Sequence, residues 1–369
     1  MNNSPLILLA AGGTGGHLFP AEALGVELMK RGMRVRLVTD SRALRYSGLF
    51  TQDMIDVVPS ETVRGRDPWS LARTGALLAA GTAVALNLMR KLKPAAVVGF
   101  GGYPTLPPLI AARLFGIPGI IHDSNAVLGR ANRFLSSRVS AIATSLPGVL
   151  DQDPALAAKT TTTGTPMRPA ILAAAAVKFE SPEPTGPLRL LVVGGSQGAR
   201  VMSDIVPPAV ERLEPALWSR LLLVQQVREE DMARVRAVYD RLKINAELAP
   251  FFSDLPARLA ASHLIISRSG AGTVAELGAV GRPSILVPLP GAIDQDQFAN
   301  AGVLAKVDGA LRIAQAEFTP DRLASEISAF AAEPAKLTAM AAAARTVGRL
   351  DAAERLADLV VKVAGIQAK

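Results

Sequence analysis

The chain of 369 residues contains no cysteine and few aromatic side chains. Without cysteine, a disulfide framework, thiolate catalysis and cysteine-ligated zinc are all excluded. Aromatic residues make up only 4% of the chain, which argues against a surface that stacks nucleic-acid bases. The formal net charge of +8 nevertheless indicates an affinity for anions. Charge alone does not choose among nucleic acid, an acidic membrane surface and a phosphorylated substrate as partners. Because aromatic residues are scarce, we expect no nucleic acid.

Long hydrophobic runs are also missing. The N-terminus lacks the basic flank and long apolar core of a signal peptide, and residues 6–11 suit a buried strand instead. An uncharged stretch at residues 75–89 contains Gly81, Thr82 and Asn87 and falls short of the ~20 apolar residues that span a bilayer. From the residues alone we expect a soluble cytoplasmic protein.

The length predicts two domains, because single hydrophobic cores stop growing near ~250–300 residues. Strand-like apolar segments alternate with helical segments in both halves, which predicts a doubly wound parallel α/β sheet in each. The expected strands are residues 6–11, 34–39, 56–58, 95–99, 117–121 and 141–144 in the first half, and 188–193, 221–225, 247–249, 264–267 and 284–287 in the second.

The boundary between the domains is predicted from composition. Residues 180–187 (Glu-Ser-Pro-Glu-Pro-Thr-Gly-Pro) suit a stiff linker, and the opening strand–glycine loop–helix pattern returns directly after them. We therefore expect an N-terminal domain at 1–168, a linker at 169–187 and a C-terminal domain at 188–345. A last helix near 350–366 has an apolar face suited to packing back on the N-terminal domain.

A glycine-rich loop follows the first expected strand in each half of the chain. In the first, residues 12–16 lead into a helix, whose free N–H groups favour an anion. Residues 194–200 repeat this arrangement. Such loops can also simply pack a helix on a sheet. Two of them facing a cleft, however, suit a diphosphate-linked substrate and its acceptor.

A third segment of this kind, residues 268–276, follows a strand and opens a helix that could hold an anion. Glu276 on that helix could accept two hydrogen bonds from a ribose diol, although a surface or capping role is an open alternative. Further along, residues 294–300 include a polar cluster suited to sugar hydroxyls, comprising Asp294, Gln295, Asp296, Gln297 and Asn300.

A metal site is the alternative interpretation of that cluster. Asp294 and Asp296 have the DxD spacing of metal-dependent sugar-nucleotide enzymes. A helix N-terminus and basic side chains can neutralise a diphosphate without a divalent ion, so we expect neither a metal nor a cofactor. Asp151 and Asp153 share the spacing but lie in an expected surface loop.

Three histidines are candidates for proton transfer. His263 precedes an apolar run and is interpreted as structural. His122 ends a strand and could orient neighbours as easily as react. His17 lies on the first glycine loop, and an imidazole of pKa ~6.5 can take a proton from a hydroxyl near neutral pH. His17 is therefore the predicted general base.

Taken in order and spacing, the motifs resemble the bacterial MurG family over nearly the whole chain. The segments that carry the resemblance are Gly12–His17, Gly99–Tyr103, His122–Asn125, Gly164–Arg168, Gly194–Arg200 and Arg268–Glu276. The resemblance implies a GT-B fold, which consists of two Rossmann-like domains facing a cleft. It also implies inverting, metal-independent transfer of N-acetylglucosamine from UDP-N-acetylglucosamine to the C4 hydroxyl of the muramyl sugar of lipid I. The product would be lipid II for peptidoglycan synthesis.

The same resemblance implies a peripheral protein on the cytoplasmic face of the inner membrane, with cell-wall synthesis and division proteins as candidate partners. A GT-B transferase with another lipid or small-molecule acceptor is the nearest alternative. A GT-B epimerase and a non-catalytic nucleotide-binding or membrane-docking module are further alternatives. A dinucleotide dehydrogenase is disfavoured, because neither glycine loop has G-x-G-x-x-G spacing followed by an acidic residue ~20 positions on.

By position, the resemblance also implies roles for individual residues. The donor sugar and diphosphate would contact Thr14, Gly15, Gly16 and Ser196, and the cleft wall would include Asn125 and Arg168. Uracil would meet the main chain at Phe252. The diphosphate, ribose and sugar would contact Ala271, Gly272, Thr273, Glu276 and Gln297. Two departures stand out. Asp123 and Ser124 replace the usual Glu-Gln, and Asp296 stands where some relatives have glutamine.

A lipid acceptor requires contact with a membrane, and residues 64–93 are the candidate segment. Apolar side chains there are combined with a basic rim, made of Arg64, Arg66, Trp69, Leu71, Arg73, Leu77, Leu78, Arg90, Lys91 and Lys93. Basic groups near an anionic surface favour binding. The alternative interpretation is a core helix with charged ends.

Overall fold

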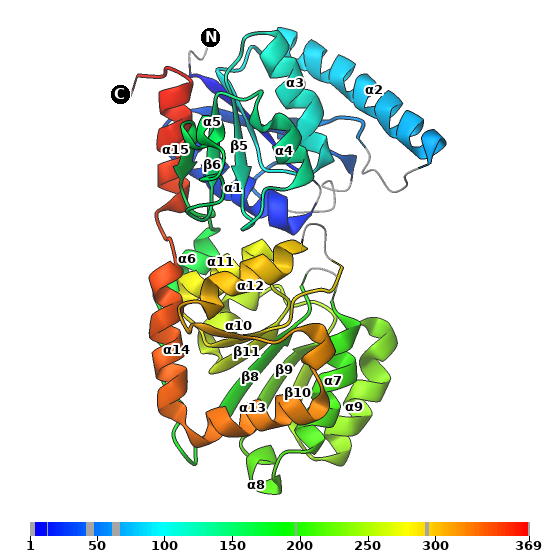
Figure 1. Cartoon of the computed structure of the whole chain (residues 1–369), viewed down its shortest axis with the longest axis vertical. Helices are drawn as coiled ribbons and strands as arrows, with labels where there is room; N and C mark the ends of the chain where they lie inside the picture. Colours follow the sequence, from blue (N-terminus) through cyan, green and yellow to red (C-terminus); the bar gives the residue numbers. More distant parts are fainter. Residues whose placement is uncertain are drawn as a thin grey trace. The chain divides into compact units, whose positions relative to one another are not determined.

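The computed structural model describes residues 4–12, 14–41, 48–60, 67–195, 198–291 and 295–367. The chain divides into two compact units (Figure 1). Unit 1 comprises residues 1–168 and 350–369, and unit 2 comprises residues 169–349. The chain therefore passes between the units twice.

Unit 1 contains a seven-stranded sheet in the order β3-β2-β1-β4-β5-β6-β7, with every neighbouring pair parallel. Parallel sheets are covered on both faces, which explains why strands such as Leu-Ile-Leu-Leu-Ala are apolar throughout. The strands are β1 (Leu6–Ala10), β2 (Arg34–Thr39), β3 (Ile55–Val57), β4 (Ala96–Gly99), β5 (Gly119–Asp123), β6 (Ala141–Thr144) and β7 (Thr160–Thr162).

Helices connect these strands and cover the sheet. They are α1 (Gly15–Lys30), α2 (Pro68–Leu92), α3 (Leu106–Leu114), α4 (Arg130–Ser136), α5 (Pro154–Ala157) and, from the end of the chain, α15 (Ala352–Val363), with short 3-10 turns at Gln52–Met54 and Tyr103–Thr105. One face of the sheet packs on α1 and α15, where Leu24 and Leu356 are fully buried. The other packs on α2, α3 and α4, where Met89 and Leu135 are buried.

Helix α15 belongs to unit 1 although residues 169–349, earlier in the chain, form unit 2. Its apolar face, with Leu356 and Val360, joins the same hydrophobic cluster as β1. Arg31 at the end of α1 donates to the Asp358 carboxylate at 2.6 Å. Helix α15 therefore contributes to the hydrophobic core of unit 1, together with β1 and α1 from the start of the chain.

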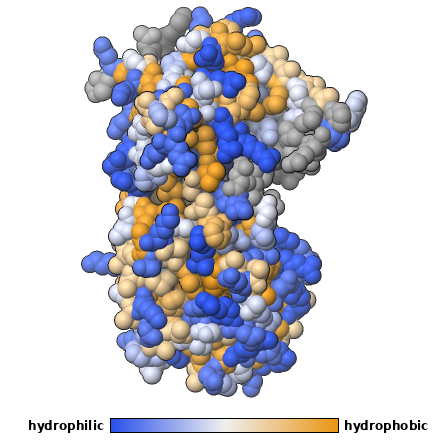
Figure 2. Space-filling model, in the orientation of Figure 1, coloured by the Kyte–Doolittle hydropathy of each residue, from blue (hydrophilic) through white to orange (hydrophobic). Residues whose placement is uncertain are grey.

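Helix α2 lies at the outer edge of unit 1 beside α3 (Figure 1). One side is docked, because a Cβ at Gly81 would lie only 2.2 Å from the Pro59 carbonyl oxygen. Over Ala72–Leu92, 21 residues, the helix is long and apolar enough to cross a membrane by length and composition alone, and only 22% of its apolar window is buried. It is longer than the uncharged stretch 75–89 considered from the sequence, because it continues through Arg73 and Arg90. Much of this part of the surface is tan to orange in Figure 2, the colours of hydrophobic residues.

Unit 2 contains a six-stranded parallel sheet in the order β10-β9-β8-β11-β12-β13. Its strands are β8 (Leu188–Val193), β9 (Leu221–Gln226), β10 (Asn245–Ala249), β11 (Leu264–Ser267), β12 (Ser284–Leu286) and β13 (Ala310–Arg312). Its helices are α6 (Pro169–Ala175), α7 (Arg200–Glu211), α8 (Pro215–Trp218), α9 (Met232–Arg241), α10 (Leu255–Ala261), α11 (Ala271–Val280), α12 (Asp296–Ala305), α13 (Pro320–Ala332) and α14 (Pro334–Val347), with 3-10 turns at Glu229–Asp231 and Gln315–Glu317.

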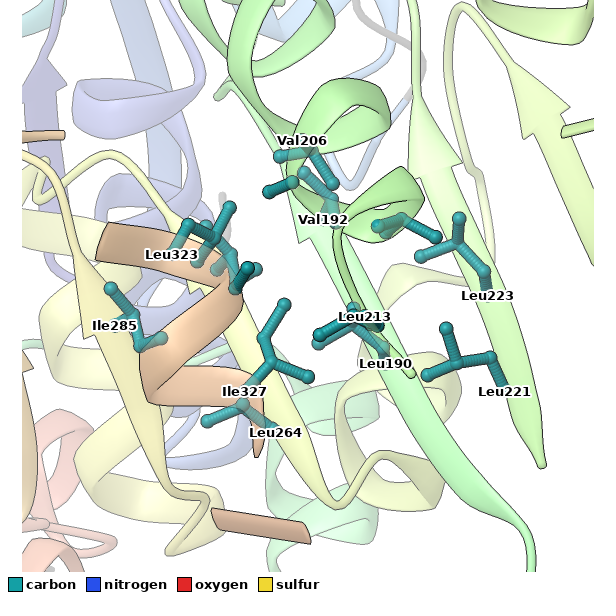
Figure 3. Packing of buried hydrophobic residues seen from close by; sticks show 14 of the residues in the cluster. Leu190, Val192, Val206, Leu213, Leu221, Leu223, Leu264, Ile285, Leu323 and Ile327 are labelled. Carbon is teal, nitrogen blue, oxygen red and sulfur yellow. The ribbon is translucent and has the colours of Figure 1, made fainter. Parts of the chain in front are cut away.

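The core of unit 2 lies between its sheet and helices α7, α9 and α13. Leu190 and Val192 of β8 meet Val206 of α7, and Leu323 and Ile327 of α13 cover the neighbouring strands (Figure 3). These aliphatic side chains are almost completely buried, and each contributes roughly 1.5–3 kcal/mol by leaving water. The two parallel α/β sheets that the alternating pattern predicted are thereby confirmed.

Residues 169–187, expected from composition to be a linker, are part of unit 2 in the structure. Helix α6 packs on α10 and α11 with Ile171 buried. The fully buried Arg282 donates to the carbonyl oxygens of Ala260 (2.6 Å) and Val177 (3.2 Å), and Arg345 donates to that of Ala175 (2.9 Å). These bonds fix the segment to unit 2 before the Pro-rich stretch begins.

Candidate active site

The first glycine loop joins β1 to α1 at the carboxyl edge of the sheet of unit 1. β1 lies between β2 and β4, so the chain order reverses direction beside it, which is where open α/β sheets bind ligands. Thr14 has extended backbone angles and precedes the helix, and the amides of His17 and Leu18 donate to its carbonyl oxygen at 3.0 Å. Gly15 is buried and Gly16 is exposed at the helix start.

The His17 ring is held against glycine backbone. A Cβ added at Gly12 would lie 3.1 Å from Nδ1, and one at Gly101 would lie 3.2 Å from Nε2. The loop after β4 is therefore brought to the loop after β1, and the Gly12 amide donates to the Gly101 carbonyl oxygen at 3.1 Å. Thr14 Oγ1 lies 3.1 Å from His17 Nδ1. Thr14 and the glycines thus fix the orientation of a half-buried imidazole.

Arg168, the last residue of the N-terminal segment of unit 1, also reaches this region. Its guanidinium stacks over the Phe19 ring at 3.8 Å from the centroid. The Phe19 ring in turn lies close to Gly15, where a Cβ would be 2.9 Å from it. The structure therefore brings Arg168 beside the first turn of α1.

Asp123, at the end of β5, organises the loop that carries Asn125. One carboxylate oxygen accepts from the Asn125 amide at 2.9 Å, and the other accepts from the Gly129 amide and from Asn132 Nδ2, both at 2.9 Å. The residue is 3% exposed. Both oxygens are used to hold the loop, so Asp123 is a positioning residue in this geometry.

His122 is fully buried beneath the same loop. Its Nε2 lies 2.9 Å from the carbonyl oxygen of Gly164, so this nitrogen carries the proton and donates. Burial lowers the pKa of His122, although the Gly164 bond and Asp123 oppose the shift. Burial therefore favours the neutral ring, which ties β5 to the Gly164–Arg168 segment. Of the two roles considered for His122, the structure favours orientation.

In unit 2, the glycine loop joins β8 to α7 beside the corresponding reversal between β8 and β11. A Cβ at Gly194 would lie 2.1 Å from the Ala199 nitrogen, so only glycine allows this tight return. The Gly194 amide donates to Gln226 Oε1 at 3.0 Å. Ser196, the predicted diphosphate contact, lies outside the described residues.

The loop after β10 carries two phenylalanines with opposite exposure. Phe252 is 7% exposed, and Arg258 lies over its ring at 4.4 Å, whereas Phe251 is 69% exposed. The Phe252 side chain is thus part of the protein interior, consistent with a predicted contact through its main chain. Phe251 is the aromatic side chain that this loop presents at the surface.

The N-terminus of α11 is open. A Cβ at Gly270 or Gly272 would meet no atom within 4 Å, and the N-cap residue, Gly270, has no side chain to cap the helix. The first amides of a helix lack intrahelical acceptors and favour an anion. Glu276 lies on the same helix and is half-buried. Ala271, Gly272, Thr273 and Glu276 therefore come together on one short helix, as predicted.

The polar cluster around α12 is largely used to build the site. Gln297 Oε1 accepts from the Leu289 amide at 3.0 Å, and its carbonyl oxygen accepts from Ser269 Oγ at 2.8 Å. Asp296 Oδ1 accepts from the Gln297 amide at 2.7 Å. Asn300 is 1% exposed and donates to the Ser269 carbonyl oxygen at 3.4 Å, so a sugar contact from its side chain, as predicted, is not supported. Asp294 lies outside the described residues.

His263 stands at the opposite edge of the unit 2 sheet, just before β11 begins. Its Nδ1 accepts from the Arg189 amide at 3.1 Å. Burial, with Arg189 and Arg282 nearby, lowers the pKa of His263 to about 4. This geometry agrees with the structural role predicted for it.

Sequence reasoning missed Asn132 and Gln226, whose side chains support the loops of the site. Asn132 donates to both Asp123 and the His122 carbonyl oxygen, and it comes from a helix with no recognisable motif. Gln226 donates to the Pro250 carbonyl oxygen at 3.1 Å while accepting from Gly194. A polar residue ending an otherwise apolar strand was the available signal for Gln226.

Comparison with known proteins agrees with this two-unit arrangement. Residues 7–144 match the glycosyltransferase family 28 N-terminal domain, and residues 189–356 match the glycosyltransferase family 28 C-terminal domain. The crystal structure of MurG from Acinetobacter baumannii is similar with a TM-score of 0.75 and 30% identity, covering 97% of this chain and 99% of that one.

Curated relatives are more similar still. A protein of Rhodopseudomonas palustris (strain BisA53) is 80% identical over 369 residues, covering 100% of this chain and 99% of the relative. A protein of Nitrobacter winogradskyi is 82% identical over 364 residues, covering 99% of each. Both bear the name UDP-N-acetylglucosamine--N-acetylmuramyl-(pentapeptide) pyrophosphoryl-undecaprenol N-acetylglucosamine transferase. The chain therefore belongs to the MurG family and is a glycosyltransferase built from the two domains of family 28.

Proposed function

We propose that this enzyme transfers N-acetylglucosamine from UDP-N-acetylglucosamine to lipid I and so makes lipid II for peptidoglycan. The observation that carries the proposal is the identity of 80% over the whole chain with relatives named for this transfer. Unit 2 supplies the donor surface, with the open N-terminus of α11 and Glu276, and unit 1 supplies the acceptor surface around His17.

The proposed chemistry is a single inverting displacement. The C4 hydroxyl oxygen of the muramyl sugar attacks C1 of N-acetylglucosamine from the face opposite UDP, so a C1–O bond to the acceptor forms as the bond to the diphosphate breaks. His17 accepts the hydroxyl proton. For Nε2 to be the base, Nδ1 must carry the other proton and donate it to Thr14 Oγ1, the partner 3.1 Å away.

The departing diphosphate gains negative charge, and helix starts are suited to stabilise it. Amides of the first turn of α11 are fixed before the reaction and so need no reorganisation, and Gly194, where the second glycine loop begins, is held by Gln226. Arg168 is the side chain of unit 1 placed to add positive charge next to α1. We propose that these groups, rather than a divalent ion, neutralise the leaving group.

Transfer of labelled N-acetylglucosamine to a lipid I analogue tests the proposal, with and without a chelator. We expect a labelled lipid II product in both arms. Loss of turnover with chelator, restored by Mg²⁺ or Mn²⁺, would contradict metal independence. An arm without acceptor detects epimerisation of the donor, and a panel of other acceptors separates lipid I from alternative substrates.

We further propose that α2 brings unit 1 to the anionic cytoplasmic face of the inner membrane. Trp69 is 80% exposed, and the exposed side of the helix continues through alanines to Val84, which is 40% exposed. Arg73 lies among them, and Arg90 and Lys91 form a basic end. Exposure favours a surface contact over a core helix. Leu77 and Leu78 are half-buried. Arg64, Arg66 and the side chain of Leu71 lie outside the described residues.

A further inference from the structure

The side chain of Gln226 connects two loops of unit 2 that belong to different strands. Gln226 is the last residue of β9 and is 6% exposed. Its Oε1 accepts from the Gly194 amide at 3.0 Å, and its Nε2 donates to the Pro250 carbonyl oxygen at 3.1 Å. Because β9 lies between β8 and β10, one amide reaches the loops that follow both neighbours.

The loop that begins at Gly194 is anchored at both ends by the same short segment. The Gly198 amide donates to the Gly195 carbonyl oxygen at 3.0 Å, and both glycines have positive φ. Arg228, two residues after Gln226, donates to the Gly198 carbonyl oxygen at 3.3 Å. Residues 226–228 therefore hold this loop at its first residue and near its last.

The loop at Pro250 is held by the same segment. The Val227 amide donates to the Ala249 carbonyl oxygen at 3.0 Å, and Gln226 binds the next carbonyl along the chain. Pro250 precedes Phe251 and Phe252 directly, so fixing its carbonyl fixes the main chain where the base is proposed to bind. Removing the Gln226 amide would leave the partly buried Gly194 N–H and the Pro250 carbonyl without this partner.

We propose that Gln226 is a positioning residue that sets the register between the diphosphate loop and the base loop of the donor site. The inference rests on the proposed function, which assigns the nucleotide to unit 2. A nucleoside diphosphate spans both loops and depends on their register. A nucleoside without phosphates occupies the base loop alone, so its binding does not depend on the register between the loops.

Two variants and one matched control test this. Gln226→Met keeps the volume but removes both hydrogen bonds, whereas Gln226→Glu keeps an acceptor for Gly194 and loses the donor to Pro250. Gln225→Met is the control. Gln225 lies next to it on β9 and is fully buried, but it accepts from Tyr239 and donates to the Met202 carbonyl oxygen within the core.

The measurements are the Kd values of UDP and of uridine by calorimetry, and KM for UDP-N-acetylglucosamine together with kcat. For Gln226→Met we expect about a tenfold weaker UDP affinity and a similar rise in KM, with uridine affinity and kcat within about threefold. Gln226→Glu should also weaken UDP more than uridine. Gln225→Met should lower Tm while leaving the ratio of the two Kd values unchanged.

Unchanged UDP affinity in both Gln226 variants would overturn the inference, as would equal weakening of UDP and uridine. A control variant that shifted the same ratio would also overturn it, because general destabilisation would then explain the effect. If Gln226→Met does not fold, the comparison of UDP and uridine binding in Gln226→Glu alone decides the test. Failure of the proposed function looks different, since the unaltered enzyme would then neither bind UDP nor transfer the sugar.

Discussion

The three histidine rings of the chain meet three different surroundings. His17 is half-buried on a helix start, with Thr14 beside Nδ1 and glycine backbone beneath the ring. His122 is enclosed and donates to a carbonyl oxygen, while His263 accepts from a backbone amide at the far end of a sheet. Only the first combines a fixed ring with access from outside. This difference supports His17 as the base in the proposed reaction.

Replacing His17 with alanine should lower kcat by about 10²- to 10⁴-fold, the contribution typical of a positioned general base. The Kd for UDP-N-acetylglucosamine should stay within about threefold, because the proton comes from the acceptor. Initial rates and donor binding measured on the same preparation provide the check. His17→Gln, which can still contact Thr14, controls for loop geometry. Comparable losses of turnover and donor affinity would instead make His17 an element of the anion cradle.

Because of His263, we expect the free energy of unfolding of unit 2 to fall in acid. Its folded pKa is about 4, below the ~6.5 of an unfolded histidine, because burial and two arginines disfavour the charged form. The unfolded chain therefore binds more protons between these values. Stability should be fully present above pH ~6.5 and should fall as the pH drops to about 4, by up to roughly 3 kcal/mol from this residue.

Urea unfolding at several pH values, followed by tryptophan fluorescence, measures how the free energy of unfolding changes with pH. The chain has two tryptophans, Trp69 in unit 1 and Trp218 in unit 2, so a Trp69→Phe background reports on unit 2. His263→Gln should flatten the pH dependence between 4 and 6.5. His122 lies in unit 1 with a pKa shifted in the same direction, and this background does not report its contribution. An unchanged slope in His263→Gln would show that other groups control the acid response of unit 2.

At the scale of elements, α2 is unusual because an apolar helix of 25 residues leaves much of its surface exposed. Its buried side, with Thr74, Gly81, Ala85 and Met89, packs against unit 1. The opposite side carries Trp69 and a row of small residues, with positive charges at the end. That pattern suits a helix lying in the plane of an anionic surface.

Replacing Trp69 with serine, or Arg90 and Lys91 together with glutamine, should weaken binding to vesicles rich in phosphatidylglycerol. For the double charge variant we expect on the order of 10- to 30-fold, at about 1 kcal/mol per basic group. Vesicle flotation measures this. Leu172→Ser is a matched control, since Leu172 is an exposed apolar residue of α6 in unit 2. Binding that does not respond to either α2 variant would rule out this helix as the contact.

The strands show how far pattern alone reaches at this scale. Segments such as 34–39, 141–144, 188–193 and 264–267 were predicted with the bounds that the structure has, because they are apolar and lie between turn signals. β7 and β13 were missed. Each has three residues and no continuous apolar run, and each is a strand only because it pairs with the edge of an existing sheet.

At the scale of the whole molecule, the chain crosses between units at residues 168–169 and 349–350. A fragment of residues 169–349 should therefore unfold cooperatively by itself. A fragment of residues 188–345, the bounds expected from composition, lacks α6 and the Val177 carbonyl oxygen that accepts from the buried Arg282. We expect its stability to be lower by at least about 4 kcal/mol, or its Tm by ~10 °C.

Calorimetry of the two fragments measures this difference, and a fragment of residues 169–345 controls for the shorter C-terminus. Equal stability of the 169–345 and 188–345 fragments would show that α6 contributes nothing to unit 2. The same comparison explains why composition misled at this point. Pro-rich sequence indicates a stiff segment, but only the buried arginines reveal which unit holds it.

The sequence by itself determined the number of domains, the parallel α/β class, most of the strands and the helix-start loops, because these follow from local periodicity and from the conformational freedom of glycine. The tertiary structure decided the rest. It paired His17 with Gly101, used both oxygens of Asp123 for a loop, buried Asn300 and joined Gly194 to Pro250 through Gln226. Those contacts join residues up to tens of positions apart, and a side chain's role depends on which neighbours the strand order places beside it.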